Sequence, residues 1–189
     1  MGPSVSTTGD GEQSDARGAD LWDDLLRGNR EHAARTATAA AAGATRPAKL
    51  PARRLFVLTC MDARVDPLPI LGLRPGDAHV VRNAGGRVTD DVVRSLLLSS
   101  ALLGTRHAVV VHHTDCGLQA TGDAHVLAQL RARGVDVGDL AIGTFADLDG
   151  SVRDDVAALA AEPLVGTELS VRGFVYDVRT HALRPVDDA

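Results

Sequence analysis

The chain has 189 residues, of which 44% are hydrophobic and 24% charged, and its formal net charge is −5. This length suits one domain with a substantial core and leaves little room for a second domain of ordinary size. The sequence lacks a Lys/Arg block and only 3% of its residues are aromatic, so a nucleic-acid-binding surface has little support. No apolar stretch reaches the roughly 18 residues of a membrane span and no signal-peptide pattern opens the chain, which predicts a cytoplasmic protein without a membrane partner.

The N-terminal part of the chain divides into three segments by composition. Residues 1–18 contain few large apolar side chains and predict a disordered tail, because nothing there offsets the entropy of ordering. Residues at about 20–34 predict an amphipathic helix. Its apolar residues at helical spacing are Leu21, Trp22, Leu25 and Leu26. The Ala/Thr-rich stretch that follows contains Gly43 and Pro47 and is typical of a linker or a frayed helix, and we assign a linker over 36–50.

Short apolar runs predict a sheet in the remainder of the chain. Three continuous runs are rich in β-branched residues and too short for helices, which favours strands at 55–58, 78–81 and 109–111. Continuous apolar character indicates strands that are covered on both faces, as in a parallel sheet. A partly alternating segment at 169–178 predicts a final strand, which could lie at an edge.

One well-punctuated helix is predicted between the second and third strands. Thr89 can cap its start, two aspartates follow in the first turn, and Gly104 suits its end. Strand, helix and strand at this spacing form a crossover unit, so the predicted fold class is α/β with helices packed on the sheet. A further helix is predicted at 151–161. We expect a core at about 55–178 within a single domain at 19–189.

Each of the two cysteines follows a predicted strand, at the carboxyl end where open α/β sheets bind ligands. Cys60 begins a Cys-x-Asp-x-Arg string with Asp62 and Arg64, and Cys116 ends a His-x-x-Cys string that begins at His113. A cysteine at the end of a buried strand is usually a small core residue, and a disulfide is a further alternative. Two thiolates and an imidazole nevertheless suit zinc, which takes four tetrahedral ligands and keeps one position for water in catalytic sites. Asp62 could fill that position or pair with Arg64, and the residues alone leave both open.

With these two strings, the chain resembles the β-class carbonic anhydrases. Its CMDAR and HTDCG segments match the family's Cys-x-Asp-x-Arg and His-x-x-Cys, and its Arg-Asn-Ala-Gly segment at 82–85 matches a third motif. The resemblance covers about 55–178. It implies a central, mostly parallel four-stranded sheet with an additional edge strand, flanked by helices, and assembly as a homodimer or higher homo-oligomer. The helix around Trp22 would then cross onto the partner subunit, the alternative being that it folds on its own subunit.

The resemblance also implies zinc as cofactor, with Cys60, His113 and Cys116 as ligands, and carbon dioxide and bicarbonate as the small-molecule partners. The implied reaction is the reversible hydration of carbon dioxide to bicarbonate and a proton by a zinc-bound hydroxide. Asp62 would accept a hydrogen bond from that hydroxide, while Arg64 would fix the carboxylate and keep it ionised. In the family's closed state the same carboxylate binds the metal, so Asp62 is also expected as a conditional ligand.

Several further residues near the motifs have candidate roles. Asn83 and Gly85 are expected to line the substrate pocket. Asp115 is expected to cap the local turn in preference to supporting a ligand. Four histidines are candidate proton shuttles or simply surface residues: His79, His107, His112 and His125.

Two other functions fit the same motifs. Some proteins that resemble this family hydrolyse carbonyl sulfide or carbon disulfide, which are linear molecules open to the same attack. A non-catalytic zinc-binding relative is the alternative of another class. It predicts a damaged motif or four permanent Cys/His ligands, whereas this chain has three such ligands and an Asp-Arg pair.

Overall fold

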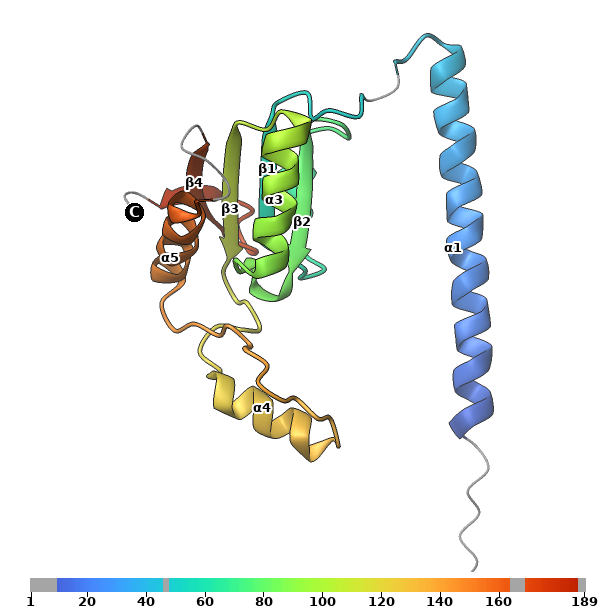
Figure 1. Ribbon diagram of the computed structural model, residues 1–189. Helices are drawn as coiled ribbons and strands as arrows, with labels where there is room; N and C mark the ends of the chain where they lie inside the picture. The colour runs from blue at the N-terminus through green and yellow to red at the C-terminus, as the bar shows by residue number, and fades with distance from the viewer. Residues whose placement is uncertain (1–9, 46–47, 164–168, 187–189) are drawn as a thin grey trace, which may run out of the picture. The chain divides into compact units, whose positions relative to one another are not determined.

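The computed structural model describes residues 10–45, 48–163 and 169–186, and the chain divides into two compact units, Met1–Arg46 and Pro47–Ala189 (Figure 1). Within the described residues, no helix combines the length and the apolar character that crossing a membrane requires.

The first unit contains a single long helix, α1 (Asp10–Ala41), which exceeds the expected helix at 20–34 on both sides. Its backbone is helical over 10–18, where we expected disorder. The rest of the expected tail, residues 1–9, lies outside the described residues. The described side chains of α1 are exposed, including those of the apolar stripe around Trp22.

The C-terminal extension of α1 corrects the linker expected over 36–50, since the helix continues to Ala41. Alanine has the highest helix propensity of all residues, so an Ala-rich stretch prolongs a helix even without a distinct apolar face. The helix stops at Gly43, whose φ of 91° is open to glycine and whose N–H donates to the carbonyl of Ala40 at 3.0 Å. The stretch had been interpreted as either a linker or a frayed helix, and its first part, up to Ala41, is helical.

The second unit is built on a five-stranded sheet with the order β2-β1-β3-β4-β5. The strands are β1 (Leu55–Cys60), β2 (Ala78–Asn83), β3 (His107–His113), β4 (Ser170–Tyr176) and β5 (Leu183–Val186). The first four are mutually parallel and β5 pairs antiparallel with β4 at the edge. This arrangement confirms the predicted fold class, a mostly parallel four-stranded sheet with an additional edge strand.

Two helices, α3 (Asp90–Leu103) and α5 (Leu148–Ala161), cover one face of this sheet (Figure 1). Residues from both helices join side chains of β1 and β3 in one buried cluster: Phe56, Leu58, Val92, Leu96, Ala108, Val110 and Leu159. A smaller cluster lies on the opposite face, where Val65, Val111 and Tyr176 are packed beside the short helix α2 (Pro67–Ile70). The central strands β1 and β3 are therefore covered on both faces, as their continuous apolar runs predicted, whereas β2 contains no buried residue, contrary to the expectation from its run at 78–81.

The α3 helix has the predicted ends, with Thr89 at its N-cap and Gly104 in a left-handed conformation at its C-cap, although the Thr89 side chain makes no capping hydrogen bond. The helix α4 (Asp123–Ala132) was not predicted from the sequence. None of its residues is buried, so it lacks the apolar periodicity that would identify it. Instead, the Asp123 carboxylate accepts hydrogen bonds from the backbone N–H groups of residues 142–144.

A turn after β2 brings backbone directly against the end of β1. This turn contains the 3-10 helix η1 (Ala84–Gly86), and both glycines in it have positive φ. A Cβ atom at Gly86 would lie 2.9 Å from the backbone N of Cys60, which leaves no space for any side chain. Glycine here lets the turn close over the carboxyl ends of β1 and β2, where the candidate site lies.

Candidate metal centre

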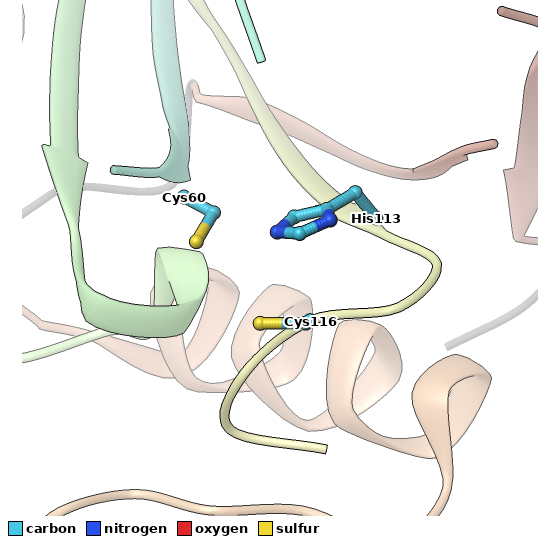
Figure 2. Close-up of side chains that lie close together, drawn as sticks. All are labelled: Cys60, His113 and Cys116. Atoms are coloured by element: carbon cyan, nitrogen blue, oxygen red, sulfur yellow. The ribbon is translucent and has the colours of Figure 1, made fainter. Parts of the chain in front are cut away.

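Three side chains converge at the carboxyl ends of the central strands. Cys60 is the last residue of β1, His113 is the last residue of β3, and Cys116 lies three residues further on. Their donor atoms all lie within 4.8 Å of one another and the three residues are buried. Figure 2 shows both sulfur atoms and the imidazole ring turned towards one another from these segments. No other such group of three occurs among the residues that the structure describes.

The orientation of His113 suits a metal ligand. Its Nδ1 lies 2.9 Å from the carbonyl oxygen of Thr114, which can only accept a hydrogen bond, so Nδ1 carries the proton. The other ring nitrogen, Nε2, is buried and has no hydrogen-bond partner in the protein. A buried nitrogen with a free lone pair is costly unless something binds it. Together with the adjacent sulfur atoms, this atom fits a zinc ion.

The two thiols differ in pKa. A hydrogen bond with Cys116 lowers the pKa of the Cys60 thiol, and the same hydrogen bond raises the pKa of the Cys116 thiol. The backbone N–H of Asp62 also points at the Cys60 sulfur, at 3.4 Å. A divalent cation that bound both sulfur atoms would displace the protons that remain on them.

Asp62 and Arg64 form a close pair beside the three donors. The Arg64 backbone N–H and Nε donate to Asp62 Oδ1 at 2.9 and 3.0 Å, and Nη2 donates to Oδ2 at 2.7 Å. These hydrogen bonds hold the pKa of the Asp62 carboxyl well below its usual value. Oδ2 also lies 3.9 Å from His113 Nε2. The structure thus places an ionised, oriented carboxylate next to the position where the donors converge.

Asp115 and Arg82 hold this pair and the adjacent backbone in place by hydrogen bonds, a role that was not predicted from the sequence. Asp115 was expected to cap its own turn, but its carboxylate and its carbonyl oxygen accept from Arg64 at 2.7 and 2.9 Å. Arg82 donates through Nε to the carbonyl of Cys60 at 3.0 Å and through Nη2 to the carbonyl of Asp62 at 2.7 Å. The only available signal for Arg82 was its position in the Arg-Asn-Ala-Gly segment.

The expected pocket residues Asn83 and Gly85 also lie near this group. Asn83 pairs with Cys60 in the β1–β2 register, and its Nδ2 donates to the carbonyl of Arg87 at 2.7 Å. Its Oδ1 is buried and without a partner in the protein. A Cβ atom at Gly85 would lie 2.9 Å from the side chain of Leu118, two residues after Cys116. Both residues therefore border the segments that carry Cys60 and Cys116.

The four candidate shuttle histidines lie in different places. His112 is fully buried and its ring is bonded to Ser151 and Gly86, so it is not a surface residue. The ring of His79 is part-buried and bonded to Ser99. His107 is exposed at the start of β3, and His125 is exposed on α4. Nothing in these contacts connects any of the four to the donors as a proton path.

The fold and the site together define an α/β protein with a two-cysteine, one-histidine metal site and a carboxylate–guanidinium pair beside it. The carbonic anhydrase family model matches residues 55–132. A β-carbonic anhydrase 1 of Mycobacterium bovis is 39% identical over 136 residues, covering 72% of this chain and 83% of the relative. A carbon disulfide hydrolase of Saccharolobus solfataricus is 40% identical over 157 residues, covering 70% of this chain and 76% of the relative.

Among solved structures, the carbonic anhydrase of Streptococcus mutans superposes with a TM-score of 0.78 at 42% identity, covering 88% of this chain and 97% of that one. The match extends over nearly the whole of that structure. The chain belongs to the β-class carbonic anhydrase family.

Proposed function

We propose that this chain is a zinc-dependent carbonic anhydrase, which hydrates carbon dioxide reversibly to bicarbonate and a proton. The observation that carries this function is the convergence of the Cys60, His113 and Cys116 donor atoms within 4.8 Å. We assign these three residues as the zinc ligands. Three protein ligands leave the fourth tetrahedral position for a water molecule, as catalytic zinc sites require.

Zinc bound here would supply a nucleophile at neutral pH by lowering the pKa of a water molecule from 15.7 to about 7. The role of Asp62 is to accept a hydrogen bond from that nucleophile and so to direct a lone pair at the carbon of the substrate. Arg64 holds both carboxylate oxygens and keeps them ionised. Asp62 is a conditional fourth ligand, and its Oδ2, which accepts from Arg64 Nη2, is the oxygen that would bind the metal.

The walls of the substrate pocket are assigned to Asn83 and Gly85, which border the ligand loops. The chain is proposed to act in the cytoplasm and as a homodimer or larger homo-oligomer. The apolar side chains of Leu21, Trp22 and Leu25 are all more than half exposed on α1. An apolar stripe on one face of a helix usually packs on another element, and we propose that α1 packs on a second copy of the chain, with 19–189 as one functional domain.

The second candidate function is carbon disulfide hydrolysis, which is favoured by one specific observation. A relative with 40% identity over 157 residues is a carbon disulfide hydrolase. Carbon dioxide and carbon disulfide are both linear, with an electrophilic central carbon, so the same nucleophile can attack either. An enzyme selects between the two substrates by the space and polarity that its pocket offers to their terminal atoms.

Parallel assays of one zinc-loaded preparation separate the two functions. We expect a kcat/KM for carbon dioxide of about 10⁴ M⁻¹ s⁻¹ or more and a clearly lower value for carbon disulfide, measured by release of hydrogen sulfide. Carbon disulfide turnover faster than carbon dioxide turnover would reassign the substrate. Full zinc loading without turnover of either compound, or of carbonyl sulfide, would identify a non-catalytic zinc-binding relative.

A further inference from the structure

A buried polar cluster lies on the helix-covered side of the sheet. We call it the Asp155 cluster, and it consists of Arg87, His112, Ser151 and Asp155. The Asp155 carboxylate, on α5, is 5% exposed, and its Oδ2 accepts from Arg87 Nε at 2.7 Å and lies 3.2 Å from His112 Nε2. Its Oδ1 accepts from the backbone N–H of Val88 at 3.1 Å. One buried carboxylate thus contacts groups from two other segments, the turn after β2 and the end of β3.

The first connection leads to Cys60 through the turn after β2. Arg87 and Val88 directly follow Gly86, whose backbone is so close to Cys60 that a Cβ atom would lie 2.9 Å from the Cys60 nitrogen. The Gly86 carbonyl also lies 3.2 Å from His112 Nε2. The contacts of Gly86, Arg87 and Val88 with the Asp155 cluster therefore hold this turn against the end of β1.

The second connection leads to His113. His112 precedes it on β3, and successive side chains of a strand point to opposite faces, so the two rings share one stretch of backbone. The His112 ring is fully buried and is held at both nitrogens, with Nδ1 at 2.8 Å from Ser151 Oγ. A ring fixed at both ends restrains the backbone from which the next side chain projects.

The third connection leads to the loop of Cys116 through Phe145. Arg87 Nη1 donates to the Gly143 carbonyl at 3.1 Å, and the guanidinium lies 5.7 Å from the centroid of the Phe145 ring. That ring also stacks on His112, with 5.7 Å between centroids. The Phe145 backbone N–H in turn donates to the Leu118 carbonyl at 3.2 Å, two residues after Cys116.

We propose that Asp155 is a positioning residue for the metal centre, holding the three ligand-bearing segments in the spacing that zinc requires. This inference rests on the proposed zinc site. A buried ion pair is weak evidence of stabilisation, because apolar residues of similar volume often serve as well. A carboxylate with two fixed donors, Arg87 Nε and the Val88 backbone N–H, supplies direction instead, and both donors lose their acceptor when the carboxylate is removed.

The test compares Asp155→Asn with Asp149→Asn. Asp149 lies on the same helix and forms a two-pronged pair with Arg184 at 3.0 and 2.5 Å, away from the ligand loops. In Asp155→Asn, an NH₂ group must face a donor, because both carboxylate oxygens of Asp155 accept hydrogen bonds. For each protein, zinc affinity is measured by chelator competition and site geometry by the visible absorption of bound Co²⁺. The melting temperature of the metal-free form is also measured.

We expect Asp155→Asn to weaken zinc binding by about tenfold, which is the low end of the range for residues that orient metal ligands. The substitution should also shift the absorption of bound Co²⁺. Asp149→Asn should lower the melting temperature at most, with unchanged zinc affinity and Co²⁺ spectrum. Wild-type affinity and spectrum in a folded Asp155→Asn protein would overturn the inference, as would equal changes in both variants or a wild-type chain that binds no zinc. If Asp155→Asn does not fold, the milder Asp155→Glu replaces it under the same criteria. A wild-type chain that binds zinc but leaves carbon dioxide unchanged refutes the proposed activity alone.

Discussion

Replacing His113 with alanine is expected to weaken zinc binding by about a thousandfold or more, and Cys60→Ala should have a similar effect. Zinc sites made of thiolates and imidazoles bind with about 10–16 kcal/mol, so the loss of one ligand in three removes several kcal/mol. The His113 Nε2 atom is already buried without a partner in the protein, so the site is prepared for this bond. Zinc content after dialysis, together with chelator competition, measures the effect.

The matched control is His107→Ala, which removes an exposed histidine from the first position of the same strand. It should retain full zinc and full activity. Retention of wild-type zinc by His113→Ala would contradict the assigned ligand set. Equal loss in the His107 variant would mean that the effect comes from unfolding of β3 and not from the ligand.

Asp62→Asn is expected to keep its zinc and to lose about 10²–10³ in kcat, within the range for groups that take part in proton and hydrogen-bond chemistry at a reacting atom. The carboxylate accepts three hydrogen bonds from Arg64, and its Oδ2 lies 3.9 Å from His113 Nε2. An amide replaces one acceptor oxygen by a donor, so it can no longer both hold Arg64 and accept from the nucleophile. Stopped-flow kinetics and zinc analysis on one sample measure both quantities.

Asp66→Asn is the control for this substitution, because Asp66 lies in the same loop and caps α2 through the backbone N–H of Leu68. Asparagine caps helices as well as aspartate, so rate and zinc content should stay at wild-type values. If Asp62→Asn loses zinc as completely as the Cys60 and His113 variants do, Asp62 is a permanent ligand and its assigned role is wrong. If its kcat is unchanged, Asp62 takes no part in the reaction.

The central strands and α3 could be predicted from sequence because local pattern and burial agree there. The runs at 55–58 and 109–111 lie within β1 and β3, and the ends of α3 lie at the predicted residues. The α4 helix could not be predicted, since it is held by the Asp123 carboxylate and buries no apolar face. The far end of α1 was also missed, because alanine propensity extends a helix without any periodic signal.

The candidate site shows the same division between local and long-range information. The ligand strings were recognisable because each follows its own strand, and parallel strands bring their carboxyl ends together. The contacts of Asp115 with Arg64, and of Asp155 with Arg87, join residues 51 and 68 positions apart in the chain. Such pairings depend on how the segments meet in three dimensions, and no spacing rule within one segment indicates them.

The proposed function requires that turnover depend on a zinc ion at Cys60, His113 and Cys116. The most direct test is stopped-flow hydration of carbon dioxide at mildly alkaline pH while metal-free protein is titrated with zinc. We expect the rate to rise in proportion to added zinc and to level off at about one zinc ion per chain. Fully loaded protein that hydrates carbon dioxide no faster than the buffer, or turnover that is independent of zinc, would contradict it.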